Sequence, residues 1–360
     1  MTYLRFEARD LGVYVASILV VVLAVGFGRW AAALNPDTRP ALTSALDALP
    51  ADTTVVGFTD WSQIREHLDV GGVDSRGERG ELAGVAARRD LSTRSVIGNR
   101  VDEMHDLLGW SAADVEWEAY GQDPDGTAAV VRLGQSASFD DLRKQLRVAG
   151  YRQDGSRWIA GKRSSLPETF TNLALVPRQR LVVLSDRSKQ LSQVLDVVDG
   201  RTRSLAGDQG AAETAKALAG SDSVLLQRGT LACESTAVTD AAREQQVRAA
   251  TARAGDLEPY RFSGRGIVDR GGSGFPAQQL VFAMTFGSAV VASEQAQVRA
   301  GLATGPFIGR NGPIDETLRL RSSVADESTT RMTFDHDPET DVFMTGTGPV
   351  LFATCDLPGS

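Results

Sequence analysis

Oxygen-bearing side chains alternate along Asp335–Asp341, with the sequence DHDPETD, a spacing that can hold a hard divalent cation. A calcium-binding loop of this type also needs a glycine at its sixth position and a bidentate glutamate at its twelfth. Those positions here hold Thr340 and Gly346. Because aspartate and proline also favour turns, we predict a solvated turn between two strands, and no metal site.

The most glycine-rich segment, Gly264–Pro276, raises the question of a phosphate site. A phosphate-binding loop lies between a strand and the start of a helix, so that backbone amides point at the anion. Here the residues that follow have the pattern of a strand, which favours a hairpin loop. The pair Gly161-Lys162 lacks the upstream glycine and the Ser or Thr of a P-loop. We therefore predict no cofactor.

The charged stretch Gly71–Arg94 mixes arginines and glycines with acidic residues. Interleaved charges without a clean period are typical of a solvated loop or a surface helix. A patch for phosphate or another anionic partner is the alternative interpretation.

Residue types for nucleophilic catalysis lack their usual patterns, because the chain contains neither a G-x-S-x-G elbow nor an S-x-x-K pair. His67 and His105 fall on expected amphipathic helices, where we interpret them as boundary histidines rather than general bases. Asp140 and Asp141 fall at an expected helix N-terminus, where carboxylates offset the helix dipole. We predict no catalytic residue, although a site assembled from distant residues stays open.

A repeated order of strands and helices must position these residues. Hydrophobic alternation predicts strands at 53–58, 115–120, 127–133, 151–160, 173–184, 223–227, 261–268, 278–286, 317–334 and 342–354. Asp60 and Ser138 are expected N-caps of two of the intervening helices. Hairpins with helices between them predict an α+β fold with antiparallel sheets. The recurring strand–strand–helix order suggests two lobes, 49–250 and 251–360, related by divergent duplication.

The apolar run Leu11–Ala33 contains one charged side chain, Arg29. About 20 apolar residues suffice to span a bilayer as a helix, so we predict a transmembrane anchor. The three alanines at its end also fit a cleaved signal peptide, but the run exceeds the usual signal core of about 7–15 residues. Both interpretations place the chain at or beyond a membrane.

The orientation of this anchor does not follow from the flanking arginines, since Arg5 and Arg9 lie before its apolar residues, and Arg29 and Arg39 lie at and beyond its other end. A short tail, 1–10, is most simply left in the cytoplasm. The connector 34–48 and the large domain would then lie outside, at the cell membrane.

The net charge of −8 and the pI near 5.1 argue against nucleic acid as a partner. Arginine far outnumbers lysine, which is typical of a high-GC, actinobacterial-like coding bias. The apolar and charged fractions, 42% and 23%, are those of an ordinary globular protein.

Two cysteines, Cys233 and Cys355, are present, and neither belongs to a C-x-x-C pair. In an exported protein such a pair most economically forms one disulfide bond. In a cytosolic protein two buried free thiols are the better interpretation.

The segments Leu49–Trp61 and Leu181–Leu226 carry a further signal. They contain an early LPADT strand, a strand ending in SD, a helix, an SLA turn, a second helix and a strand. This pattern resembles a group of uncharacterised bacterial extracytoplasmic proteins, which carry a domain of unknown function behind an N-terminal anchor or lipoprotein signal. The resemblance implies export and brings no activity. No lipobox cysteine is present, so the anchor would be the helix itself.

These observations predict a single-span extracytoplasmic protein of the bacterial cell envelope. We expect a non-catalytic module that interacts with the membrane through its N-terminal helix, and with envelope proteins or lipids through its domain. The alternative is an envelope hydrolase, or a lipid or small-molecule carrier, with a site between the lobes.

Overall fold

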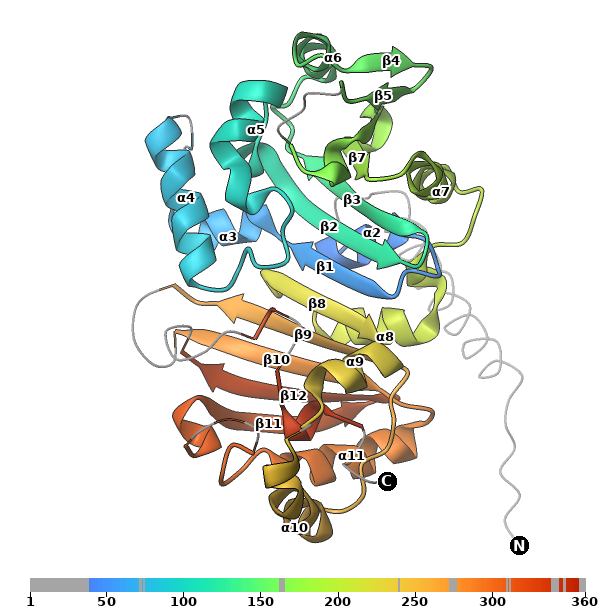
Figure 1. Ribbon diagram of the computed structural model, residues 1–360. Helices are drawn as coiled ribbons and strands as arrows, with labels where there is room; N and C mark the ends of the chain where they lie inside the picture. The colour runs from blue at the N-terminus through green and yellow to red at the C-terminus, as the bar shows by residue number, and fades with distance from the viewer. Residues whose placement is uncertain are drawn as a thin grey trace, which may run out of the picture.

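The computed structural model describes residues 39–355, apart from 71–72, 74, 162–165, 239, 272–276, 309, 311, 338–342 and 346–347. One antiparallel sheet of twelve strands runs through this part of the chain (Figure 1). Across the sheet the strands are β11 (Leu318–Asp326), β12 (Thr329–His336), β10 (Gln278–Thr285), β9 (Phe262–Asp269), β8 (Ser223–Arg228), β1 (Val55–Thr59), β2 (Val115–Asp123), β3 (Gly126–Leu133), β7 (Leu181–Ser185), β6 (Asn172–Val176), β5 (Arg157–Ile159) and β4 (Arg152–Asp154).

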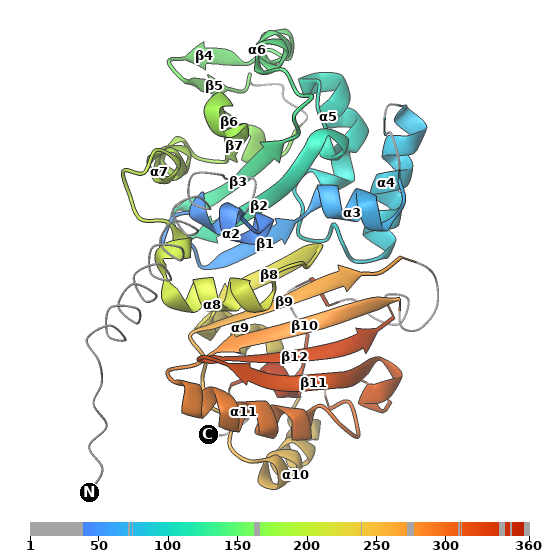
Figure 2. The same ribbon diagram turned by 180° about the vertical axis from the view of Figure 1, so that it is seen from behind.

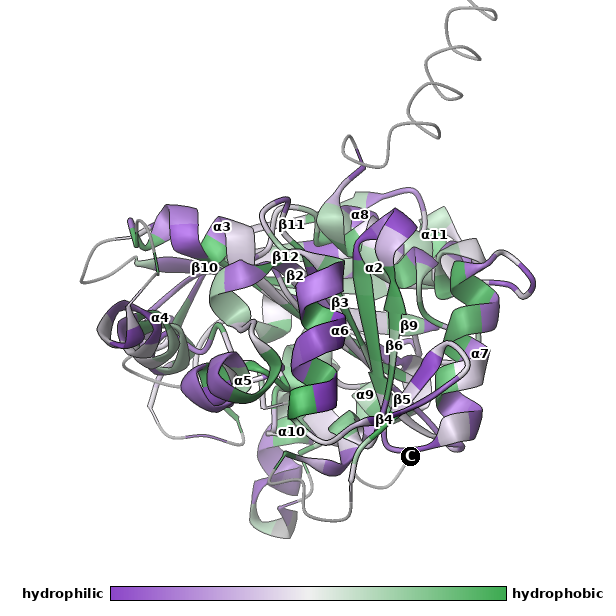
Figure 3. Ribbon diagram, turned by 90° about the horizontal axis from the view of Figure 1, so that it is seen from above, coloured by the Kyte–Doolittle hydropathy of each residue, from purple (hydrophilic) through white to green (hydrophobic). Residues whose placement is uncertain are grey.

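Helices cover both faces of the sheet (Figures 1 and 2). The larger core lies beneath α3 (Trp61–His67), α4 (Arg76–Arg88), α5 (Val101–Leu108), α6 (Phe139–Val148), α9 (Gly229–Thr236), α10 (Glu244–Ala254) and α11 (Ala289–Leu302). The smaller core, on the other face, lies beneath α2 (Ala41–Asp47), α7 (Ser188–Val198) and α8 (Gln209–Ala217). Figure 3 shows hydrophilic residues on the outer sides of α6 and α7 above largely hydrophobic strands. The predicted α+β class, with a large antiparallel sheet, is confirmed.

The strand order repeats within the sheet. The run β1-β2-β3-β7-β6 has the same connectivity as β8-β9-β10-β12-β11: one strand, helices, a hairpin, a helix and a second hairpin that returns beside the first. The first strands of the two runs pair antiparallel at the centre, where Gly57 lies opposite Leu225.

This central pairing differs from the expected pair of separate sheets, because β8 uses both of its edges, one for β1 and one for β9. Strands from both predicted lobes therefore share one sheet. The lobe boundary at residue 250 stays a prediction.

Several predicted strand limits are wrong. The segments 151–160, 173–184 and 317–334 are each a hairpin rather than one strand. The described residues of 342–354 contain no strand, and η9 (Leu351–Ala353) is a short 3₁₀ helix. Phe343, Val350 and Phe352 are fully buried in the larger core, so this segment is apolar because it covers the core and not because it pairs.

Helix starts follow the predicted caps. The carboxylate of Asp60 accepts the backbone N–H of Gln63 at 3.0 Å. The hydroxyl of Ser138 accepts the N–H of Asp141 at 3.3 Å. The stretch 71–94, expected as a loop or a surface helix, contains α4, which begins with a capping box between Ser75 and Glu78.

The predicted disulfide pair is brought together. Cys233 on α9 and Cys355 after η9 have their sulfur atoms at bonding distance and their Cα atoms 5.1 Å apart, across 122 residues of sequence. The carbonyl of Ala353 also accepts the hydroxyls of Tyr260, at 2.7 Å, and Thr236, at 3.1 Å. The C-terminal segment is therefore fastened to α9 and to the larger core.

The predicted anchor, Leu11–Ala33, lies outside the described residues. Among the helices that the structure does describe, none combines the length and the apolar character needed to cross a bilayer.

Candidate functional site

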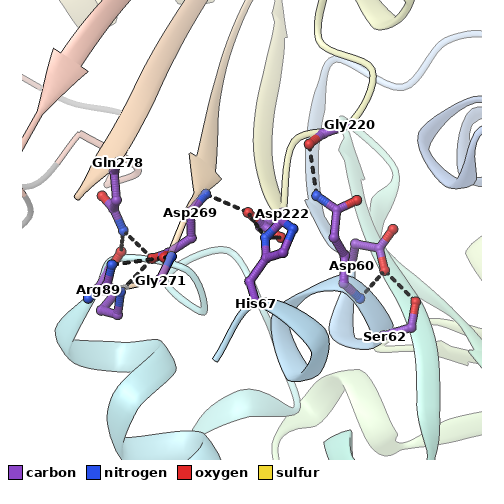
Figure 4. A network of polar contacts seen from close by, with 10 residues as sticks. Asp60, Ser62, His67, Arg89, Gly220, Asp222, Asp269, Gly271 and Gln278 are labelled. Carbon is purple, nitrogen blue, oxygen red and sulfur yellow. Dashed lines mark hydrogen bonds and ion pairs between the residues drawn. The ribbon is translucent and has the colours of Figure 1, made fainter. Parts of the chain in front are cut away.

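An aspartate–histidine pair lies between the end of α3 and the start of the central strand β8 (Figure 4). Asp222 directly precedes β8, and its backbone is fixed on two sides: its carbonyl accepts the N–H of Asp60 at 2.7 Å, and its N–H donates to Ile267 at 2.8 Å. His67 is the last residue of α3. Its Nδ1 lies 3.1 Å from Oδ1 and 3.2 Å from Oδ2 of Asp222. The pair thus joins α3 to the start of a central strand.

A second carboxylate, Asp269 at the end of β9, lies beside the first. Its oxygens accept Nη2 of Arg89 at 2.8 Å, Nε2 of Gln278 at 2.9 Å and the N–H of Gly271 at 2.7 Å. Its own backbone N–H donates to Oδ2 of Asp222 at 2.6 Å. Since Arg89 follows α4 directly, this cluster fastens α4 to the sheet next to α3 (Figure 4).

Burial sets the electrostatics of this network. The Asp222 side chain is fully buried, and desolvation raises its pKa from 3.8 to about 6. The N–H of Asp269 and the His67 ring act in the opposite direction, because both favour the carboxylate form. Desolvation also raises the pKa of Asp60. Near neutral pH, Asp222 is therefore an ionised buried group held by hydrogen bonds.

An Asp–His pair can orient a general base, but this one lacks the other parts of a catalytic site. The only hydroxyl of α3, on Ser62, donates to Asp60 at 2.7 Å instead of facing His67. Five hollows on the described surface are lined by residues other than His67 and Asp222. The pair serves to hold α3 and α4 on the sheet.

Glu118 of β2 plays a similar part for the segment that follows α4. Its carboxylate is fully buried and accepts Nε1 of Trp61 at 3.2 Å, the hydroxyl of Ser95 at 2.5 Å and the N–H of Val96 at 2.7 Å. Desolvation raises the pKa of this carboxyl, and these hydrogen bonds lower it. A buried acid with all its partners inside the protein is a structural element rather than a reactive one.

A groove on the opposite face of the sheet is the described surface best suited to a ligand. It lies between α2 and the C-terminal end of α7, has a volume of about 560 Å³, and has Trp117 of β2 and Leu181 of β7 in its lining. Four arginines also line it: Arg39, Arg132, Arg178 and Arg180. This basic, partly apolar surface stands out in a chain of net charge −8.

The acidic residues of the groove neutralise only part of this charge. Arg132 pairs with Glu116 at 2.8 Å, and Arg39 pairs with Asp47 at 2.5 Å. Arg180 donates instead to the backbone carbonyls of Leu133, Gly134 and Ala137. Carbonyl oxygens carry no net charge, so the groove keeps an excess of positive charge.

The other residues considered in the sequence do not form a common site. Asp140 and Asp141 pair with Arg143 and Lys144 on the exposed face of α6. In the predicted turn 335–341, Asp335 pairs with Arg321, His336 is buried, and 338–341 lie outside the described residues. No group of His, Cys, Asp or Glu suited to a metal ion occurs among the described residues.

Only part of the glycine-rich segment belongs to the described residues. Residues 264–269 belong to β9, pairing with β10 as expected, and 272–276 lie outside the described residues. Lys162 also lies outside them. His105 is on α5, as expected.

Sequence reasoning missed the arginine groove, because its arginines come from three separate segments of the chain. It also missed the His67–Asp222 pair, whose members are 155 residues apart in the sequence. A signal was present only for His67, which was expected on the helix that Asp60 begins.

Comparison with known proteins adds little to this geometry. No family model matches the chain, and no curated protein matches it. Two solved structures are similar: crystal form I of TP0453, with a TM-score of 0.38 and 9% identity over 82% of this chain and 94% of that one, and crystal form III, with 0.38 and 8% over 85% and 96%. We draw no conclusion from this likeness. The resemblance to uncharacterised envelope proteins stays a prediction.

Proposed function

We propose that this chain is a non-catalytic binding module of the cell envelope, anchored in the membrane by residues 11–33 with its large domain outside the cytoplasm. Its ligand binds in the groove between α2 and α7. The observation that carries the proposal is the position of Arg39, which lines the groove and lies six residues after Ala33, the end of the predicted anchor. The binding surface is thus tied by sequence to the anchor.

The competing functions lack support of this kind. A hydrolase would need its perturbed acid and its histidine in a cleft, whereas the groove is lined by residues other than His67 and Asp222. A carrier would need an enclosed apolar cavity, whereas the groove is open and arginine-rich. Both observations favour binding at the surface.

The cysteine pair supports the extracytoplasmic side of the proposal. Disulfides form and persist in oxidising compartments and are rare in the cytosol. Cys233 and Cys355 lie in bonding geometry in the described structure.

We also infer that the repeated strand order arose by duplication of a five-stranded unit. The first unit begins at β1 and the second at β8, and β4 and β5 are an addition to the first. The groove distinguishes the two units, because its arginines belong to the first unit or to the segment before it.

A fusion to the C-terminal residue, Ser360, tests the topology. We expect a reporter that is active only outside the cytoplasm to be active at this position. Activity of a cytoplasm-only reporter would overturn the proposal.

Photo-crosslinking in living cells tests the binding surface. A photoreactive amino acid at Gln135, an exposed residue of the groove, should give adducts with an envelope partner. The matched control is Gln153, an exposed glutamine on β4 outside the groove. Equal adducts from the two positions would contradict a specific site at the groove.

A further inference from the structure

We propose that the arginine groove binds the phosphate of an anionic phospholipid headgroup in the bilayer that holds the chain. This inference rests on the proposed function, because it takes the anchor as given and names the ligand of the same groove. Three features of the groove carry it: its charge, its apolar lining and its distance from the anchor.

The charge of the groove is suited to an anion. Its four arginines face two acidic residues, Asp47 and Glu116, so two positive charges stay without a carboxylate. Arg178 is exposed and makes no hydrogen bond or ion pair with a described residue. Its guanidinium is therefore available to a ligand, and arginine binds phosphate oxygens in a planar, bidentate manner.

The turn at Arg180 is held in place by the side chain of this residue. Arg180 has a φ of +58°, a left-handed conformation that non-glycine residues seldom adopt. Its side chain returns to three carbonyls of the segment 133–137, which holds the turn after β6 against the turn after β3. The same turn carries Arg178, which lines the groove.

Part of the remaining lining is apolar, and this part distinguishes a lipid from a free anion. Trp117, Leu181 and Val197 are largely buried, and each contributes to the lining of the groove. Inorganic phosphate would gain nothing from these side chains. An amphipathic molecule would place its phosphate at the arginines and its apolar part on this surface.

The short connector allows the groove to lie at the bilayer. Ala33 and Arg39 are separated by six peptide links, which span at most about 22 Å at about 3.3–3.6 Å per residue. The headgroup layer adds about 5–7 Å outside the hydrocarbon on each side of a bilayer. Arg39 can therefore reach the headgroups while the anchor is embedded.

The test is a calorimetric titration of the full-length chain in a non-ionic detergent. The ligands are dihexanoyl-phosphatidylglycerol, its phosphatidylcholine counterpart, glycerol phosphate and inorganic phosphate. We expect the anionic lipid to bind more tightly than the other three. Equal binding of the two lipids would overturn the proposal, and so would equal binding of inorganic phosphate and the anionic lipid.

A charge reversal identifies the site. One basic side chain near an anionic surface contributes about fivefold in affinity, so Arg178→Glu, a change of two charges, should weaken binding of the anionic lipid about 25-fold. The matched control is Arg152→Glu on β4, an exposed arginine outside the groove, which should leave the affinity unchanged. If Arg178→Glu fails to fold, Arg178→Gln should lower the affinity about fivefold. Wild-type affinity in a folded Arg178 variant would overturn the assignment.

This experiment and the topology test fail independently. Binding in detergent does not depend on which side of the membrane the domain occupies. A cytoplasmic reporter result would remove the proposed function, whereas an absence of headgroup binding in a correctly exported protein would remove only this inference.

Discussion

Replacement of Asp222 by asparagine should remove a pH-dependent cost of folding. The pKa of this buried carboxyl is raised from 3.8 to about 6 in the folded protein, chiefly by desolvation. Between these two pH values the folded protein keeps a proton that the unfolded chain has lost, so stability falls as the pH rises through this window. Above it the loss is constant. At about 1.4 kcal/mol per pH unit, the cost at neutral pH is about 3 kcal/mol.

Asparagine has nearly the shape of aspartate and does not ionise. Its side-chain oxygen can still accept the N–H of Asp269, which lies 2.6 Å from Oδ2 of Asp222. We expect the Asp222→Asn protein to gain about 3 kcal/mol relative to the wild type as the pH rises from about 4 to about 7. Urea unfolding at several pH values, followed by tryptophan fluorescence, measures this difference.

The control is Asp141→Asn, the same chemical change at an exposed site where Lys144 lowers the pKa of the carboxyl. It should leave the pH profile close to that of the wild type, because exposed pairs contribute little to stability. The reasoning is refuted if the difference in stability between Asp222→Asn and the wild type stays the same from about pH 4 to about pH 7. In that case ionisation of the buried Asp222 carboxyl would carry no cost of folding.

Three further predictions concern stability. Reduction of the Cys233–Cys355 bond, or replacement of both cysteines by serine, should lower the free energy of unfolding by up to about 5 kcal/mol, because the bond spans 122 residues. Calorimetry with and without reductant measures this loss, and an unchanged Tm would contradict the bond. Arg299→Ala should lower the free energy of unfolding in denaturant by about 3–5 kcal/mol, because this fully buried guanidinium donates to the carbonyls of Phe352 and Thr354. A loss under about 1 kcal/mol would show that water replaces the guanidinium. Asp269→Ala should release α4, seen as faster hydrogen exchange in residues 76–88 with α11 unaffected, and equal exchange in both helices would count against a local fastening.

Local signals predicted local structure well. The caps Asp60 and Ser138, the hairpin partners β2 with β3 and β9 with β10, and the alternation of strands and helices were all readable, because each depends on residues close in sequence. Apolar alternation predicted a strand wrongly where a segment is apolar because it covers the core. The C-terminal segment has the alternating pattern of a strand, but it covers the larger core without pairing.

The contacts between distant segments could not be predicted from patterns. The His67–Asp222 pair needs the start of β8 beside the end of α3, and the groove needs the turn after β6 beside α2. Nothing in the spacing of these residues records that proximity. The cysteines were the exception, since only two were available to pair.

The central pairing of β1 with β8 has a consequence for the order of synthesis. While the chain emerges, β1 can pair with β2, but its other edge stays open until β8 is made, and an open edge invites pairing with other chains. The second unit then completes the sheet, and Cys355 follows its last strand, β12, in the sequence. A newly made chain would therefore depend on protection of the β1 edge, and the bond between Cys233 and Cys355 can form only after every strand of the sheet has been made.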